Sequence, residues 1–232
     1  MVSWAENKRI KSAMKQSKTT GLIPLLFLLI PWLYLAFIWG DLPDRIPTHF
    51  GITGAPDAFG NRNEIVIAPA IMTITGILLF VLLRNIHKID PKKKYSEATV
   101  SAMAKIATAV LLLLSAVTIF ILYWTTQGKI AGFTALFCLL GLFFTYLGNL
   151  MHSVKPNYFV GFRTPWTLEN EQNWRKTHQL ASKVWFTGGI LLTVLSFLLP
   201  VKILLVVFVG ILLIMTLIPL VYSYRMYRSM SK

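Results

Sequence analysis

Residue types that could carry chemistry gather in two polar stretches, while most of the remaining sequence is apolar. The first stretch, Asp41–Glu64, holds His49 and four acids within a segment rich in Pro and Gly. Imidazole and carboxylate groups could together bind a metal ion. Solvated acids on a loop of turns and short extended pieces explain the same residues, so we predict no metal site here.

The second polar stretch, Tyr158–Lys183, is too patterned to be only a linker. Gly161 permits a positive φ or a close approach of another group, because it has no Cβ. Arg163 adds a planar cation, and Pro165 fixes φ near the start of a helix while it keeps Thr164 out of the α region. We expect a structured element here.

A helix is expected to follow Pro165. Thr167 is expected to cap it through its hydroxyl, with Glu169 and Glu171 beside the positive end of the helix. Four residues recur at steps of four, three and four, which places them on one face: Trp174, His178, Ala181 and Trp185. An amphipathic segment therefore runs directly into an apolar one.

Arg163 is expected to be the most sensitive charged position in the protein. Its guanidinium offers five donors in a rigid fork, which could bond backbone carbonyls or a carboxylate and stack on a tryptophan such as Trp166. Lysine would keep the charge and lose the fork. We therefore expect Arg163→Lys to impair the protein nearly as much as Arg163→Ala.

No catalytic motif accompanies these residues. The four histidines show no His-Glu-x-x-His spacing, and the sequence has no Gly-x-Ser-x-Gly elbow, phosphate-binding glycine loop or dinucleotide fingerprint. His178 is expected to be packed rather than catalytic. We predict a protein that is not an enzyme, with no catalytic residues and no cofactor.

The composition indicates a membrane protein. Only 14% of the residues are charged, against roughly 25% in soluble domains, and 55% are apolar. Six uncharged runs are near the length that spans a bilayer: Gly21–Gly40, Ile65–Leu83, Ile106–Trp124, Ile130–Met151, Val184–Leu199 and Ile203–Val221. The first is too long for a secretory signal, so we predict that it is retained. The predicted fold is all-α, a bundle of six transmembrane helices.

The net charge of +14 is explained by topology. Lys and Arg are dense in segments 1–20, 84–101, 152–183 and 222–232, and sparse in loop 41–64 and the two short turns. The positive-inside rule then places both termini and the 152–183 segment in the cytoplasm, and loop 41–64 outside. The basic charge requires no nucleic-acid partner. Domains are accordingly 1–20, 21–151 with four spans, 152–183, 184–221 with two spans, and the tail 222–232.

Two motifs resemble a known family. Gly161-Phe-Arg-Thr-Pro-Trp-Thr-Leu168, followed by Trp174 and His178, resembles the pattern of the SdpI-like family of bacterial membrane proteins. Leu42-Pro-Asp-Arg-Ile-Pro-Thr-His-Phe-Gly51 is similar to a short domain of unknown function often found at the amino end of such proteins. The resemblance implies a multi-pass protein of the bacterial cytoplasmic membrane that gives immunity to a secreted antimicrobial peptide toxin.

The resemblance also implies partners beside membrane lipid: the secreted toxin and, in some members, a cytoplasmic transcriptional repressor that is held at the membrane for signal transduction. The cytoplasmic motif comprises Gly161, Arg163, Thr164, Pro165, Trp166, Thr167, Trp174 and His178. The acidic outer loop suits a basic toxin. Its candidate sensing residues are Asp41, Pro43, Asp44, Pro47, His49 and Asp57. A lid that only closes the bundle explains this loop equally well.

A small membrane transporter and a membrane-embedded enzyme are the alternatives. No Asp, Glu, Lys or Arg lies near the middle of any of the six apolar runs. Ionisable groups at that depth are the usual mark of an ion or proton path, so the transporter is disfavoured.

Overall fold

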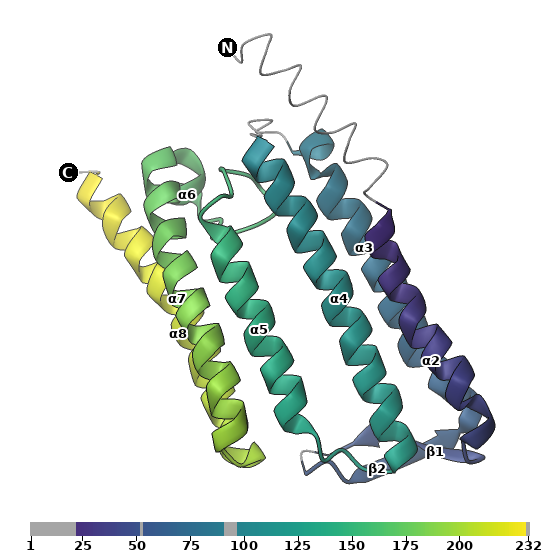
Figure 1. Cartoon of the computed structure of the whole chain (residues 1–232). Coiled ribbons are helices and arrows are strands. Elements are labelled where there is room, and N and C mark those ends of the chain that lie inside the picture. Colours follow the sequence, from purple (N-terminus) through teal and green to yellow (C-terminus); the bar gives the residue numbers. More distant parts are fainter. Residues whose placement is uncertain (1–21, 52, 91–96, 231–232) are drawn as a thin grey trace.

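The computed structural model describes residues 22–51, 53–90 and 97–230; the basic segment 1–20 and the lysine run 92–94 lie outside the described residues. Six helical stretches in the described part are long and apolar enough to cross a membrane. They run side by side in one bundle (Figure 1). The predicted all-α, multi-pass membrane fold is confirmed.

The spans have these bounds. The first combines two 3₁₀ helices and an α-helix: η1 (Ile23–Leu29), α2 (Ile30–Ile38) and η2 (Trp39–Asp41). The other five are α3 (Ile67–Ile89), α4 (Glu97–Gln127), α5 (Phe133–Met151), α7 (Glu171–Leu198) and α8 (Val201–Met230). Two short helices, η3 (Arg62–Val66) and α6 (Pro165–Glu169), precede α3 and α7.

Two predicted boundaries are not helix ends. The amphipathic segment and the fifth apolar run form one helix, α7, so nothing interrupts the chain between 183 and 184. The helix α8 likewise continues through 222 to Met230, into the predicted tail. Neither junction carries a proline or a helix-ending glycine motif, so the backbone hydrogen-bond ladder continues across both.

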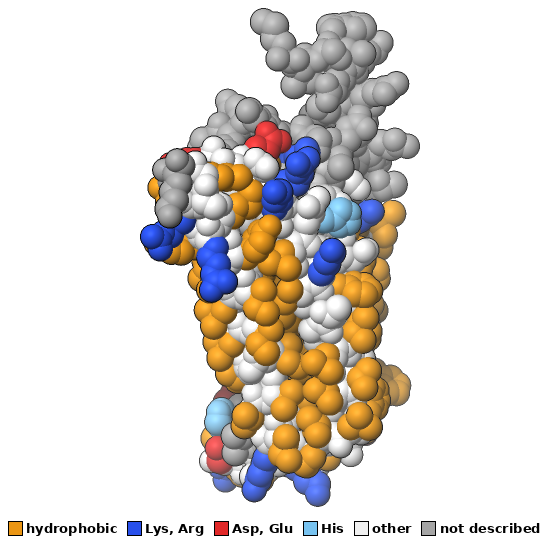
Figure 2. Space-filling model, turned by 90° about the vertical axis from the view of Figure 1, so that its left-hand side faces the viewer, with side chains coloured by type: hydrophobic (Ala, Val, Ile, Leu, Met, Phe, Trp, Pro, Cys, Tyr) orange, Lys and Arg blue, Asp and Glu red, His pale blue; other side chains and the backbone are white. Residues whose placement is uncertain are grey.

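The outer faces of the bundle are apolar. Phe37, Val206 and Leu198 are 82%, 73% and 69% exposed, which suits side chains solvated by lipid rather than water. Hydrophobic side chains cover the middle of the face in Figure 2, whereas Lys and Arg gather towards its two ends. This distribution matches a protein that spans a bilayer.

A β-hairpin lies at one end of the bundle, where turns and short extended pieces were predicted (Figure 1). Strand β1 (Arg45–Phe50) pairs antiparallel with β2 (Pro56–Asn61), with irregular register around His49. Ile46 anchors the hairpin, because it is buried among Leu35, Leu42, Ile65 and Leu122. We call this the hairpin end.

The opposite end carries α6 and a segment that we call the motif loop, residues 152–164, between α5 and α6 (Figure 1). Below it, α5 and α7 pack at backbone distance. A Cβ at Gly189 would lie 2.5 Å from the amide nitrogen of Thr145. The hydroxyl of Ser182 also donates to the carbonyl of Gly148 at 2.7 Å. Small residues therefore fix how these two helices sit together.

The motif loop joins two parts of the bundle. Val154 packs in one buried cluster with Ile86 of α3, Met103 of α4 and Trp174 of α7. A separate buried cluster of α5, α7 and α8 contains Phe137, Leu192, Leu204, Ile211 and Met215. The loop thus rests on both α3–α4 and α7, which holds it in a defined place.

Candidate functional site

Asn157 organises the first half of the motif loop. Its buried side chain accepts hydrogen bonds from the amides of Phe159 and Val160 at 2.9 and 2.7 Å. Its amide group donates to the carbonyls of Lys155 and Val160 at 2.9 and 3.1 Å. The side chain replaces the backbone partners that a helix or sheet would supply, which lets an irregular loop be buried.

The peptide groups of Tyr158 are held from both sides. The amide of Tyr158 donates to the carboxylate of Asp90, just after α3, at 3.0 Å. Its carbonyl accepts from Nη1 of Arg163 at 2.6 Å. The expected bond between Arg163 and a backbone carbonyl is therefore present, and it closes the motif loop back on itself.

Trp166, one candidate partner for the expected stack with Arg163, packs on other aromatic rings. The indole of Trp166 is instead stacked on Tyr227 at 5.9 Å and meets Tyr224 edge-on at 5.4 Å, both on α8. Its Nε1 donates to the hydroxyl of Ser223 at 3.0 Å. The sequence interpretation ended the sixth span at residue 221. In the structure α8 continues as a helix to Met230 alongside α6, so its aromatic side chains can pack against the ring of Trp166.

His178 and Gly161 meet directly. His178 is buried and stacks on Trp174 with ring centroids 4.0 Å apart. Its Nδ1 lies 2.8 Å from the carbonyl of Trp174, and its Nε2 accepts from the amide of Phe162 at 3.1 Å. These partners define a neutral imidazole with its proton on Nδ1. The expectation of a packed His178 agrees with this geometry.

Gly161 has a φ of 108°, which L side chains rarely adopt. A methyl group on its Cα would also overlap Nε2 of His178. Both predicted uses of this glycine, positive φ and close approach, occur at one position.

The helix cap lies three residues before its predicted place. Thr164 is the N-cap of α6, and its hydroxyl accepts from the amide of Thr167 at 3.4 Å. The hydroxyl of Thr167 is turned back, bonded to the carbonyl of Phe162 at 2.7 Å. Pro165 occupies the first turn, where no backbone donor is needed, so the cap must precede it.

Asn170 then caps α7, accepting from the amide of Asn173 at 2.8 Å. Glu171 is in the first turn of α7, as expected for an acid beside a helix start, but Glu169 ends α6. The chain breaks between two helices here because Asn170 adopts an extended conformation.

Trp174 and Asn173 connect α7 to its neighbours. The Nε1 of Trp174 donates to the carbonyl of Val154 in the motif loop at 2.8 Å. The amide of Asn173 donates to the carbonyl of Ser223 on α8 at 3.0 Å. Both side chains are buried, so the start of α7 is fixed to the loop on one side and to α8 on the other.

A proline in α8 is matched by a tryptophan in α7. Pro219 lies inside α8 and has no amide hydrogen, so the carbonyl of Met215, four residues earlier, lacks its usual helical donor. The Nε1 of Trp185 donates to that carbonyl at 2.9 Å. The sequence interpretation missed this pair, although a proline within an apolar run was the available sign.

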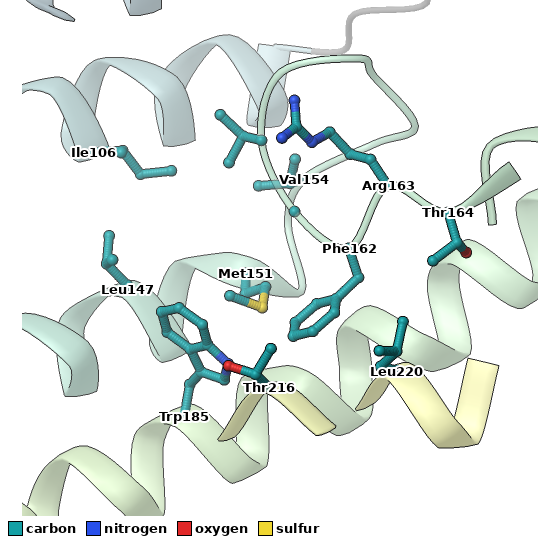
Figure 3. Close-up of a pocket in the computed structure, with 12 residues that line it drawn as sticks. Ile106, Leu147, Met151, Val154, Phe162, Arg163, Thr164, Trp185, Thr216 and Leu220 are labelled. Carbon is teal, nitrogen blue, oxygen red and sulfur yellow. The ribbon is translucent and has the colours of Figure 1, made fainter. Parts of the chain in front are cut away.

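A cavity of about 410 Å³ lies under the motif loop (Figure 3). Ile106 of α4 faces it from one side, and Leu147 and Met151 of α5 with Trp185 of α7 lie on the other. Phe162 and Arg163 of the loop complete the wall. Five of the eight predicted motif residues (Trp166, Thr167, Pro165, Trp174 and His178) are absent from this lining and act in the scaffold around it.

The predicted outer residues all lie at the hairpin end. Asp41 ends η2, Pro43 and Asp44 follow it, Pro47 and His49 are in β1, and Asp57 is in β2. Five of the six are exposed, but Pro47 is buried and cannot form part of a sensing surface. His49 Nδ1 lies 2.5 Å from Asp57 Oδ1. Within the described residues, no three His, Cys, Asp or Glu side chains are close enough to hold a metal ion.

The hairpin tip is tied to the bundle. The amide of Ile130, between α4 and α5, donates to the carbonyl of Gly54 at 2.8 Å. At the hairpin base, Arg62 lies over the ring of Trp39 with 5.0 Å between the guanidinium carbon and the ring centroid. The loop is therefore seated on the helices rather than extended from them.

Comparison with known proteins gives two family matches. Residues 153–223 match the SdpI/YfhL protein family, and residues 26–73 match DUF1648, a domain of unknown function. The chain is 25% identical over 211 residues to immunity protein SdpI of Bacillus subtilis strain 168. The aligned region covers 91% of this chain and 97% of that protein. An uncharacterized protein of Archaeoglobus fulgidus is 38% identical over 58 residues, which is 25% of this chain and 32% of that protein.

No solved structure matches significantly. The SdpI/YfhL match begins in the motif loop and ends on α8, so it contains the contacts of Trp174 and His178 with the loop and the bond from Trp166 to Ser223, while Tyr224 and Tyr227 lie just beyond it. The DUF1648 match begins within η1 of the first span and contains the whole hairpin. With a family match at each end of the bundle, and with the SdpI relative aligned over nearly its full length, the chain is similar to SdpI-family proteins that carry a DUF1648 segment at their amino end.

Proposed function

We propose that the protein is a membrane immunity protein, which protects the cell that makes it against a secreted antimicrobial peptide toxin. The observation that carries this proposal is the similarity to immunity protein SdpI over 91% of the chain. An alignment of that extent includes both the hairpin and the motif loop. The two polar segments of this bundle therefore both lie in the region that aligns with a protein named for immunity.

The proposed orientation has the hairpin end outside the cell and the motif loop in the cytoplasm. Basic side chains support it, because they outnumber acids at the loop end of the described chain. The described cations there include Arg84, Lys88, Lys105, Lys155, Arg163, Arg175, Lys176, Lys183, Arg225 and Arg228. Cytoplasmic loops carry such an excess of Lys and Arg.

The hairpin is the proposed toxin-sensing surface. Asp41 and Asp44 are exposed acids beside β1, which would attract a basic peptide arriving from outside. The hairpin also contacts the connection between α4 and α5 through Gly54 and Ile130. A peptide bound to the hairpin would therefore contact a structure that is hydrogen-bonded to the transmembrane helices through their α4–α5 connection.

At the other end, the motif loop is the proposed contact for a cytoplasmic repressor. Tyr158 and Arg163 are exposed on this loop, whose backbone is fixed by buried side chains, and Pro165 is exposed beside them at the start of α6. A rigid surface loses little conformational entropy on binding. Cell fractionation would show whether a repressor moves to the membrane only when both toxin and this protein are present.

Protection is tested in Bacillus subtilis cells that lack their own SdpI and grow beside toxin-producing cells. Cells that express this protein are expected to survive, and cells that express an Arg163→Ala variant at equal membrane abundance are expected to survive less. Equal killing with and without the protein would contradict the immunity function for that toxin. Solute uptake into vesicles containing the purified protein would instead support a transporter, and turnover of a substrate would support an enzyme.

A further inference from the structure

We propose that the cavity under the motif loop is a binding site for a phospholipid with an anionic headgroup, with one acyl chain in the cavity and the phosphate at Arg163. This inference does not depend on the immunity function. It rests on the lining of the cavity, on how its polar atoms are used and on the position of its single cationic residue.

The cavity walls are suited to a hydrocarbon chain. The volume of about 410 Å³ lies within the range of roughly 300–1,000 Å³ typical of sites that enclose small ligands. Ile106, Leu147, Met151, Val154 and Leu220 supply apolar surface from α4, α5, the loop and α8. The site lies between transmembrane helices, so its nearest source of ligand is the bilayer.

The polar side chains that line the cavity are bonded within the protein. Trp185 donates its Nε1 to the carbonyl of Met215 at 2.9 Å. The hydroxyl of Thr216 donates to the carbonyl of Leu212 at 2.8 Å, and that of Thr164 donates to Thr167 at 3.1 Å. These three residues therefore present mainly apolar atoms to an occupant, so the body of the ligand must itself be apolar.

Arg163 is the exception among the lining residues. It is the one charged residue of the twelve described residues that line the cavity, and its side chain is exposed. Among the described residues, its side chain makes one hydrogen bond, from Nη1 to the carbonyl of Tyr158. A guanidinium has five donor hydrogens, so the others can bind a phosphate oxygen pair.

The arrangement in Figure 3 indicates where the headgroup and the acyl chain of such a lipid would lie. The guanidinium of Arg163 lies on the loop side of the cavity, and the side chains of Met151, Leu147 and Trp185 lie towards the helices. A basic pocket between transmembrane helices on the cytoplasmic side is a recognised form of site for anionic lipid headgroups. The surrounding excess of Lys and Arg at this end strengthens the preference for a negative charge.

The test is native mass spectrometry of the full-length protein in detergent, titrated with phosphatidylglycerol, phosphatidylcholine or inorganic phosphate. Phosphatidylglycerol adducts are expected to exceed phosphatidylcholine adducts about fivefold at equal concentration, the effect of one arginine near an anionic headgroup. Arg163→Gln is expected to abolish this preference. Arg175→Gln, which removes a cation from the exposed face of α7 outside the cavity, is expected to retain it.

Thr216→Leu tests the acyl-chain part separately, because it adds carbon to the cavity wall on α8 without changing charge. It is expected to reduce adducts of both lipids. Equal adducts of the two lipids on the parent protein would overturn the proposal, as would an equal loss in Arg175→Gln and Arg163→Gln. Displacement of phosphatidylglycerol by inorganic phosphate alone would show a free-anion site and would also overturn it.

Discussion

Nε2 of His178 lies against the Cα of Gly161, so that no side chain fits between the motif loop and α7 at this point. The same nitrogen accepts the amide hydrogen of Phe162 at 3.1 Å. One imidazole thus fixes the loop by a hydrogen bond and by exclusion of a side chain. This contact gives a physical reason for a glycine at the first position of the Gly161–Leu168 segment.

Gly161→Ala is expected to destabilise the protein and to reduce protection. A residue forced into this backbone conformation costs roughly 1–3 kcal/mol, and the overlap with His178 adds to that cost. Thermal unfolding in detergent would measure the change. Gly210→Ala on α8 is the matched control, because a Cβ there meets nothing within 4 Å. If both alanine variants melt alike, the close contact at 161 has no energetic weight.

His178 and Gly161 are expected to be energetically coupled. His178→Ala removes the ring that a methyl group at 161 would meet, so Gly161→Ala should cost less in that background. Contacting residues show coupling of roughly 0.5–3 kcal/mol in double-mutant cycles. The backbone strain at φ 108° remains in both backgrounds, so a residual cost is expected. Strict additivity of the two unfolding free energies would refute a direct contact.

The hydrogen bond of Trp185 is expected to stabilise the protein most when Pro219 is present. Trp185→Phe leaves the carbonyl of Met215 without a donor, which costs roughly 0.6–1.7 kcal/mol for a hydrogen bond between membrane helices. Pro219→Ala restores an amide that can bond this carbonyl within α8. The loss from Trp185→Phe should therefore shrink on the Pro219→Ala background, as measured by unfolding. An unchanged loss would mean that packing of the ring, rather than its hydrogen bond, stabilises the bundle.

The spans and the two polar ends could be predicted from the sequence, because long uncharged runs and clusters of Pro, Gly and charge are local signals. The two-helix arrangement at Pro165 was predicted only in part. The choice of Thr164 rather than Thr167 as cap depends on where Pro165 falls within the first turn.

Contacts between distant segments were not predictable in this way. Asn157 and Asp90 stabilise the motif loop, yet neither residue belongs to a sequence pattern that indicates these contacts. The partner of Trp166 lies about sixty residues away on α8. Such pairs are set by tertiary packing, for which periodicity along a single helix contains no information.

The topology predicts accessibility at two positions. In a Cys138→Ser background, a cysteine at Asp57 in β2 is expected to react with a membrane-impermeant thiol reagent in intact cells. A cysteine at Arg175 on the exposed face of α7 is expected to react only after lysis. Mass shift of the labelled protein measures both. The reverse pattern would place the hairpin in the cytoplasm and remove the basis for toxin sensing by it.

The acids of the hairpin end are expected to contribute unequally to protection. Asp57 lies 2.5 Å from His49, and Glu64 accepts the amide of Asn61 at 2.8 Å, so both carboxylates already have partners within the hairpin. Asp41 and Asp44 are exposed, and their carboxylates have no hydrogen-bond or ion-pair partner among the described residues. These two carboxylates are therefore the better attractors for a basic peptide.

Asp41→Asn combined with Asp44→Asn is expected to reduce protection, and the loss should be larger at low ionic strength, where exposed charges are less screened. Asp57→Asn alone is the matched control, because it removes the same charge from a carboxylate that already faces an imidazole. Survival of toxin-exposed cells at equal membrane abundance measures both. A double variant that protects as well as the parent would exclude electrostatic sensing by this surface. An equal loss in Asp57→Asn would instead show that the fold of the hairpin, rather than its free charge, is what the toxin requires.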